Sequence, residues 1–239
     1  MQLAGKTALV TGGSDGIGLA IARELKAAGT SVIVVGRNAA RLADAEAEGF
    51  EAIAADLAGE AGCTALLQAL HGRTIDILIN NAGMGSGFDV DAPIDLAETD
   101  RCIFLNLNAP IRLIVGLLDA LRARPTAMIV NVTSGLAIAP NAGAPVYCAT
   151  KAGLRSFTMA LRRQLRDSSV DVLEVLPPVV ETRMTEGNNH KKLPAAECAR
   201  QVVAAMATGR AEANVGMTRW LRLAYSVSPA LARRIMLNY

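Results

Sequence analysis

Tyr147 and Lys151 stand four residues apart in the segment Val146–Ala152. In a helix this spacing places both side chains on one face, one turn apart. A free phenol has a pKa of about 10, and a nearby ammonium group favours its ionised form. Such a pair can act as a general acid that protonates an oxygen atom. Surface helices also carry Tyr and Lys at this spacing by chance, so the surrounding elements decide between the two interpretations.

The composition favours a large apolar core. Hydrophobic residues make up 51% of the 239 residues, charged residues 19% and aromatic residues 3%. This suits one α/β domain built from Ala, Val, Leu and Ile. The formal net charge of +2 gives no electrostatic case for nucleic acid as a partner. Because no signal peptide and no long uncharged apolar run is visible, we expect a cytoplasmic protein.

The residues that most often bind metals are scattered: Cys63, Cys102, Cys148, Cys198, His71 and His190. Their spacing predicts neither a metal site nor a disulfide framework, and it suits a reducing cytosol. Cys148 follows Tyr147 directly. No histidine or second cysteine supports it as a nucleophile, so we expect it to pack in the interior.

Short β-branched runs alternate with longer Ala/Leu-rich segments. The predicted strands are Thr7–Val10, Ser31–Val35, Glu51–Ala54, Ile75–Asn80, Ala127–Val132 and Val170–Leu176. The predicted helices are Ile17–Ala28, Ala39–Glu48, Ala61–Leu70, Leu96–Arg122, Tyr147–Arg166 and Ala195–Thr208. This alternation predicts a Rossmann-like, doubly wound parallel sheet with helices on both faces, in a single domain over residues 1–239.

Within this domain, residues 1–130 form mainly the cofactor-binding half, 131–216 the catalytic and substrate half, and 217–239 a basic, apolar extension. A short last strand is expected at Ala213–Gly216, and Ser228-Pro229 marks a new helix start. Peripheral contact of the extension with an anionic membrane is one interpretation. Packing over the substrate pocket or against a partner subunit is the favoured one, because the segment is short and Pro229 breaks it.

The first strand leads into the glycine-rich segment Thr11–Gly18, of pattern TGxxxGxG, and a helix follows. Glycines permit a tight turn, and the helix N-terminus attracts an anion. An ordinary glycine-rich turn is the alternative, but this position between strand and helix indicates a dinucleotide site. Its candidate contacts are Gly12, Ser14, Asp15, Gly16, Ile17 and Gly18.

The second strand ends at Gly36-Arg37, where a site that prefers NAD usually places an acid. A guanidinium can bind a 2′-phosphate by forked hydrogen bonds. We therefore expect NADP(H) to be preferred, with NAD(H) as the other option. Asp15 counts against this preference, because a carboxylate does not favour a phosphate. The alternative is that Arg37 only caps the strand end in solvent.

Two further strand ends would face the same crevice. Asp56, followed by Leu57, could accept a hydrogen bond from an adenine amino group, or it could cap a helix. The fourth strand ends in Asn80–Gly83, with Asn81, Ala82 and Gly83 as candidate cofactor contacts.

In their order and spacing, these segments resemble the short-chain dehydrogenase/reductases of the single-domain branch. The motifs that carry the resemblance are TGxxxGxG at Thr11–Gly18, Asp56, NNAG at Asn80–Gly83, Asn106, Ser134, YxxxK at Tyr147–Lys151, and Pro177. They extend from the start of the chain to about Thr185.

The resemblance implies a role for each catalytic position. Tyr147 would exchange a proton with the substrate oxygen, and Lys151 would lower the pKa of Tyr147 and hold the nicotinamide ribose. Ser134 would hydrogen-bond the carbonyl, and Asn106 would hold a water that supplies protons. Rivals remain open, since Thr133 and Asn108 stand close to these positions and Ser134 could merely cap a turn.

After the sixth strand the family often has Pro-Gly, whereas this chain has Pro177-Pro178, which should stiffen the turn. The resemblance implies cofactor contacts at Pro177, Val180 and Thr182, the last to the nicotinamide carboxamide. The polar segment Glu181–Leu193, which includes Asn188, is expected to be a mobile lid over the substrate.

The expected function is therefore an NADP(H)-dependent oxidoreductase that reduces a carbonyl to an alcohol, or the reverse, by hydride transfer. The alternatives are a non-catalytic dinucleotide sensor and an isomerase, epimerase or dehydratase that uses transient hydride transfer. Apolar segments around the site predict a small apolar substrate. The helices Leu96–Arg122 and Tyr147–Arg166 could form a homodimer or homotetramer interface, as in the family.

Overall fold

A computed structural model describes residues 1–187 and 189–238, so Asn188 of the expected lid and Tyr239 of the extension lie outside the described residues. Within these described residues, seven strands form one sheet in the order β3-β2-β1-β4-β5-β6-β7. They are β1 Thr7–Thr11, β2 Ser31–Gly36, β3 Glu51–Ala54, β4 Ile77–Asn80, β5 Ala127–Val132, β6 Val170–Leu176 and β7 Glu212–Asn214. Every neighbouring pair is parallel, which confirms the predicted doubly wound sheet.

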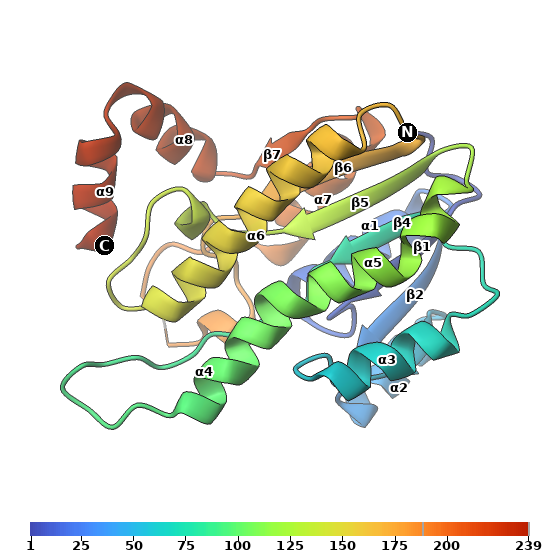
Figure 1. Ribbon diagram of the computed structural model, residues 1–239, viewed down its shortest axis with the longest axis horizontal. Coiled ribbons are helices and arrows are strands. Elements are labelled where there is room, and N and C mark those ends of the chain that lie inside the picture. Colours follow the sequence, from blue (N-terminus) through green and yellow to red (C-terminus); the bar gives the residue numbers. More distant parts are fainter. Residues whose placement is uncertain (188, 239) are drawn as a thin grey trace.

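Helices cover both faces of the sheet (Figure 1). The helices α1 (Gly16–Ala27), α2 (Ala39–Ala47) and α7 (Ala195–Ala207) pack on one face. The helices α3 (Glu60–Ala69), α5 (Ala109–Arg122) and α6 (Pro145–Gln164) pack on the other. Successive strand residues face opposite sides, so Val10 belongs to the first core and Leu9 to the second. This explains why the strands are continuous apolar runs.

The strand order reverses between β1 and β4, so the chain leaves their carboxyl ends in opposite directions. A crevice forms at such a switch point, and ligands of open α/β sheets bind there. The glycine-rich segment, Asn80–Gly83 and the carboxyl end of β5 all lie at this edge. The topology therefore brings together the candidate residues that the sequence separates.

The helix predicted over Leu96–Arg122 is not continuous. It consists of α4 (Leu96–Ile103), a π-helical turn η1 (Phe104–Asn108) and α5. Pro110 has no N–H for the carbonyl four residues earlier, which favours such a local change. The whole stretch is long and apolar enough to cross a membrane by length and composition. It nevertheless packs against α3, α6 and the sheet, as the core helix of a folded domain does.

Other boundaries differ by one or two residues. β4 begins at Ile77 rather than Ile75, because the Asp76 carboxylate accepts a hydrogen bond from Thr7 N at 2.9 Å and pairs with Arg124 at the sheet's rim. The last strand, β7, precedes its predicted position by a residue. Helix α6 starts at Pro145, so Tyr147 lies in its first turn.

The extension folds into two helices, α8 (Thr218–Val227) and α9 (Pro229–Leu237). Ser228 caps α9, which confirms the predicted helix start. Thr218 and Leu221 of α8 lie against Gly135, beside the end of β5. The outer side of α8 exposes Trp220 and Leu223. The extension thus packs against the segment that follows β5, and its packing over a substrate pocket stays a prediction.

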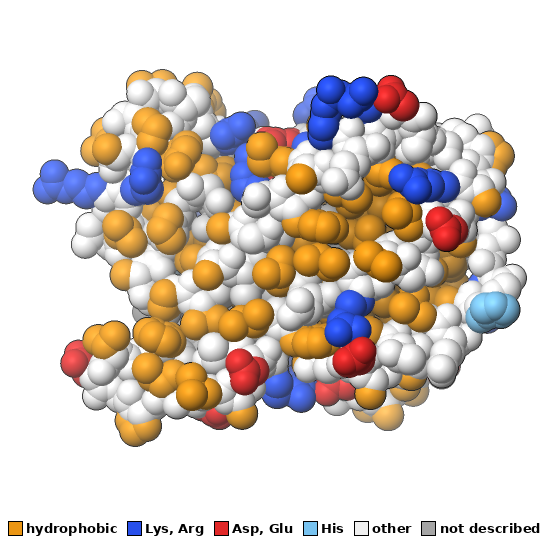
Figure 2. Space-filling model, viewed as in Figure 1, with side chains coloured by type: hydrophobic (Ala, Val, Ile, Leu, Met, Phe, Trp, Pro, Cys, Tyr) orange, Lys and Arg blue, Asp and Glu red, His pale blue; other side chains and the backbone are white. Residues whose placement is uncertain are grey.

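Hydrophobic side chains also gather on the outside of α5 and α6 (Figure 2). Val115 of α5 is 69% exposed and Met159 of α6 is 50% exposed.

Candidate active site

The glycine-rich loop between β1 and α1 has the backbone shape of an anion site. Gly12 and Gly16 have φ values of 63° and 53°, in the left-handed region that glycine tolerates. A Cβ on Gly18 would lie 2.2 Å from the carbonyl oxygen of Gly12. Close packing of α1 against the loop therefore requires glycine there, and it leaves the helix N-terminus open to an anion.

Thr11 and Asn81 hold this loop against the end of β4. The Thr11 hydroxyl accepts hydrogen bonds from the N–H groups of Asn81 and Ala82, both at 3.0 Å. The Asn81 amide donates to the carbonyl of Thr11 at 3.0 Å. The Asn81 side chain therefore shapes the loop. Thr11 was missing from the predicted site residues, although its hydroxyl at a strand end next to glycine was a usable signal.

Two arginines, Arg37 after β2 and Arg41 of α2, lie near this loop. Arg41 of α2 pairs with Asp15 at 2.7 Å, and Asp15 also caps α1 by accepting from Gly16 N. Arg37 is exposed and forms no ion pair within residues 1–187 and 189–238. Arg41 thus neutralises the carboxylate that counted against NADP(H), while Arg37, whose charge also acts on Asp56, lies exposed to solvent where a phosphate can reach it. These residues fit a 2′-phosphorylated dinucleotide.

Asp56 lies in a turn after β3 and does not cap α3, whose N-cap is Gly59. The helix-cap alternative is therefore wrong. Its carboxylate accepts from Ala58 N at 3.1 Å and pairs with Arg101 at 3.0 Å. Burial acts to raise the pKa of Asp56, but these hydrogen bonds outweigh it and hold the pKa below its usual range. Leu57 is buried in the core.

The catalytic candidates meet where α6 crosses the end of β5. Lys151 is buried, and its Nζ donates to the carbonyl of Val132 at 2.9 Å. The same Nζ lies 5.7 Å from the centroid of the Tyr147 ring. The Ser134 hydroxyl also accepts from Leu136 N at 3.1 Å, so it caps the 3-10 turn η2 (Gly135–Ala137) while facing Tyr147. The turn-capping and catalytic interpretations of Ser134 are therefore compatible.

Desolvation dominates the electrostatics of Tyr147 and Lys151. Burial raises the pKa of Tyr147 to about 12, and hydrogen bonding to Ser134 acts against that rise. Burial lowers the pKa of Lys151 to about 8. Desolvation dominates at Tyr147, and the Lys151 ammonium group is held by the Val132 carbonyl, so the lowering of the Tyr147 pKa by Lys151 stays a prediction. Tyr147 is protonated at neutral pH, as a proton donor must be.

Asn106 is turned inward by the π-helical turn and is fully buried. Its Oδ1 accepts from Met84 N at 2.9 Å, and its Nδ2 donates to the Met84 carbonyl at 2.9 Å and to the Thr150 hydroxyl at 3.1 Å. Thr150 in turn donates to the carbonyl of Tyr147 at 2.7 Å. Asn108 is exposed. Asn106, and not its rival, therefore lies against the catalytic helix.

The segment after β6 closes over the phosphate loop. The Pro177 carbonyl accepts from Gly135 N at 2.9 Å. A Cβ on Gly16 would lie 3.1 Å from the Thr182 methyl group, so Thr182 stands directly above the loop. Val180, which is buried, bridges to Leu193. Glu181 N also donates to the Leu193 carbonyl at 2.9 Å, so the predicted lid is tied at its base.

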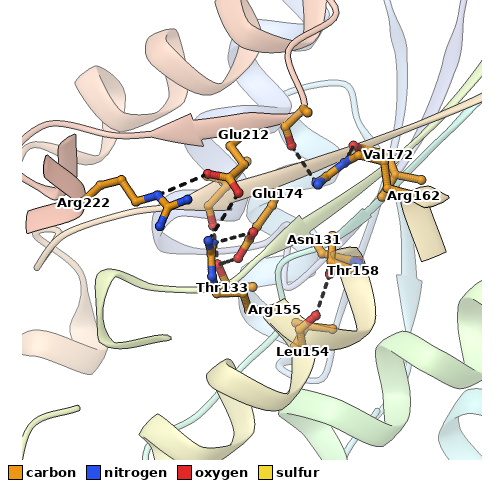
Figure 3. Close-up of polar contacts among 12 residues, drawn as sticks. Asn131, Thr133, Leu154, Arg155, Thr158, Arg162, Val172, Glu174, Glu212 and Arg222 are labelled. Carbon is orange, nitrogen blue, oxygen red and sulfur yellow. Dashed lines mark hydrogen bonds and ion pairs between the residues drawn. The ribbon is translucent and has the colours of Figure 1, made fainter. Parts of the chain in front are cut away.

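Two of the remaining predictions concern neighbours of the catalytic residues. Cys148 is buried, and burial raises the pKa of its thiol, so it packs as expected. Thr133, the rival of Ser134, points to the opposite side and donates to Glu174 at 2.8 Å. Glu174 and its partner Arg155 were missed, since a buried ion pair across distant segments leaves no local pattern (Figure 3).

The sheet, its switch point and the glycine-rich loop define a dinucleotide-binding α/β oxidoreductase fold. The chain belongs to the short-chain dehydrogenase family, whose model matches residues 6–193. An uncharacterised oxidoreductase, DltE, of Bacillus subtilis is 41% identical over 197 residues, covering 80% of this chain and 78% of DltE.

Two solved structures are similar over almost the whole chain. One, a short-chain dehydrogenase from Burkholderia cenocepacia in complex with NADP, has a TM-score of 0.89, 24% identity and 99% coverage of both chains. The other, a short-chain dehydrogenase from Sphingobium yanoikuyae in complex with NADPH, has a TM-score of 0.83, 28% identity and 95% coverage of both chains.

Proposed function

We propose that this protein is an NADP(H)-dependent oxidoreductase that reduces a carbonyl to an alcohol, or catalyses the reverse reaction. The observation that carries the proposal is the meeting of Ser134, Tyr147 and Lys151 beside the phosphate loop. Arg37, free of ion pairs within the described part of the chain, supports the 2′-phosphorylated cofactor. The relative from Sphingobium that was solved with NADPH supports it as well.

The residues have distinct tasks in this reaction. The phosphate loop and Arg37 hold the cofactor, which when bound supplies the hydride for the carbonyl carbon. Ser134 donates a hydrogen bond to the carbonyl oxygen and orients it toward the phenol. Tyr147, protonated at neutral pH, gives its proton to that oxygen as negative charge develops there. The charge on Lys151 stabilises the phenolate that remains.

Asn106 and Thr150 keep the catalytic helix in register with the segment after β4. We propose that a water next to Asn106 returns a proton to Tyr147 by way of Lys151. The apolar surroundings of the site favour a small hydrophobic ketone or alcohol over a charged substrate. A cytoplasmic location suits a reaction that draws on the cellular NADPH pool.

The test compares the wild-type chain with Tyr147→Phe on a panel of apolar ketones and alcohols, with NADPH and NADP⁺. We expect the wild type to turn over at least one ketone. The variant should bind NADPH with unchanged affinity and lose turnover by about a thousandfold, the range of a lost general acid. Full activity in Tyr147→Phe would refute the mechanism. Tight NADPH binding without turnover of any panel member would favour the dinucleotide sensor instead.

A further inference from the structure

A buried carboxylate lies behind the catalytic strand end, where hydride transfer does not use it. Glu174 of β6 is fully buried. One of its oxygens accepts from the Thr133 hydroxyl at 2.8 Å, and the other pairs with Arg155 of α6 at 2.7 Å. Figure 3 shows the three side chains converging from the segment just after β5, from β6 and from α6. Burying an ion pair seldom improves stability over apolar residues of similar size. Its position therefore suggests a different role.

Thr133 stands between two backbone positions on which the chemistry depends. The residue before it, Val132, provides the carbonyl that holds Lys151. The residue after it, Ser134, provides the hydroxyl that faces Tyr147. The Thr133 hydroxyl has two acceptors for its one proton, the Glu174 carboxylate at 2.8 Å and the Val175 carbonyl at 3.0 Å. The strand end that carries Ser134 is thereby fastened to β6.

Arg155 continues the row that begins with Tyr147 and Lys151 on α6, each one turn after the last. Its guanidinium pairs with Glu174 by one nitrogen, and its other nitrogen lies 3.3 Å from Glu212 of β7. Glu212 in turn lies 3.8 Å from Arg222 of α8. The helix that carries the proton donor is thus fastened to the same carboxylate as the strand that carries Ser134.

We propose that Glu174 and Arg155 are positioning residues, which clamp the Ser134 strand end to the Tyr147–Lys151 helix and so set the geometry of proton transfer. This inference rests on the proposed function. The spacing of Ser134 and Tyr147, on which it depends, can be measured without any turnover. Arg222 extends the same clamp to the C-terminal extension.

The chain offers a matched control on the same helix. Arg162 also ties α6 to β6 through the carbonyl of Val172 at 2.8 Å (Figure 3), and to the segment before β7 through the carbonyl of Ala211 at 2.7 Å. It lies about two turns further along α6 than Arg155, away from Tyr147. Arg162→Met therefore removes a helix-to-sheet tie without touching the clamp.

The main variant is Glu174→Met combined with Arg155→Met, which removes both charges and leaves no unpaired buried ion. We expect kcat to fall by about tenfold or more, with NADPH affinity unchanged, because positioning acts on the reacting geometry. Arg162→Met should keep kcat within about twofold. Arg155→Lys, which keeps a cation for Glu174, should recover most of the lost kcat.

The second readout is the NMR resonance of the Tyr147 ring carbon that bears the hydroxyl, assigned by its absence in Tyr147→Phe. It should shift in the double variant and stay unchanged in Arg162→Met. If the wild type turns over no substrate, the proposed function fails. The resonance alone then shows whether Glu174 and Arg155 position Tyr147. Glu174→Gln replaces the double variant if that does not fold. Wild-type kcat with an unshifted resonance in the clamp variants overturns the inference, as does an equal loss in Arg162→Met.

Discussion

The ammonium group of Lys151 donates a hydrogen bond to the backbone carbonyl of Val132, with 2.9 Å between Nζ and the oxygen. This contact joins the catalytic helix α6 to the end of β5, and it places a cation beside Tyr147 in a buried position. The charge is costly to bury, and burial lowers the pKa of Lys151 from 10.5 to about 8. The folded protein thus keeps the charge of Lys151 next to Tyr147, where the proposed proton transfer needs it, at a cost in stability.

We predict that Lys151→Met makes the protein more stable than the wild type at pH 7, while activity is lost. The unfolded lysine binds its proton more tightly than the folded one, so wild-type stability rises with pH between about 8 and 10.5. Below pH 8 the folded wild type bears the full cost of the buried charge, at most about 3 kcal/mol. The variant avoids this cost but loses about 1 kcal/mol with the hydrogen bond to Val132. Urea unfolding at pH 7 and pH 10 should show the gap narrowing as pH rises. A variant less stable than the wild type at pH 7 would contradict this account.

Asn106→Ala should cost about 2 kcal/mol of stability, because it leaves the buried Thr150 hydroxyl and the partly buried backbone groups of Met84 without their partner. Turnover should fall as well, since Thr150 no longer connects the catalytic helix to the Met84 segment. Thermal unfolding and kcat measure the two effects. Asn108→Ala, at an exposed position two residues away, is the control and should change neither. Equal effects at both positions would refute the assignment of Asn106.

Gly18→Ala should disrupt the phosphate loop. The added methyl group would lie 2.2 Å from the Gly12 carbonyl and 2.5 Å from the Asn81 amide, so α1 or the loop must move. We expect NADPH affinity to fall by about tenfold or more, measured by calorimetric titration, because the backbone no longer fits the phosphates. Gly85→Ala, where a Cβ meets nothing within 4 Å, should bind NADPH like the wild type. Unchanged affinity in Gly18→Ala would argue that the cofactor binds elsewhere.

Arg37→Asp should reverse the cofactor preference. The guanidinium that would bind the 2′-phosphate is replaced by a carboxylate that repels it and can accept from ribose hydroxyls. The ratio of kcat/KM for NADPH over that for NADH should drop by about a hundredfold, the scale of a lost charged contact. Arg210→Asp controls for the change in net charge at another exposed position. A ratio that moves equally in both variants would remove Arg37 from the site.

We predict that the exposed apolar surface of α5 and α6 is the interface of a homo-oligomer. We expect Val115→Arg and Met159→Arg to reduce the molar mass in solution, measured by light scattering after gel filtration, because a charge at an apolar interface stays unpaired. Val227→Arg, at a residue of α8 that is 79% exposed, is the comparison. If Val227→Arg alone dissociates the protein, the interface lies on the C-terminal extension.

Much of the fold was predictable, because each element has a local cause. These causes act through near neighbours in the chain. They are the apolar runs of strands covered on both faces, the glycines after β1 and the proline at the start of α9. Tyr147 and Lys151 were predictable for the same reason, as one helical turn joins them. The π-helical turn at Phe104–Asn108 was not predicted: Pro110 favours a local change there, but the contacts of Asn106 with α6 and the Met84 segment come from distant parts of the chain.

The sequence by itself determined the order of strands and helices, the phosphate loop and the residue types available for proton transfer. Only the tertiary structure decided how those residues behave. It buried Lys151 and partly buried Tyr147, which raises the pKa of Tyr147 and lowers that of Lys151, and it paired Asp15 with Arg41. It also brought Glu174 to Arg155 behind Ser134. Desolvation and ion pairing depend on distances between groups far apart in the chain, and spacing along the sequence does not specify them.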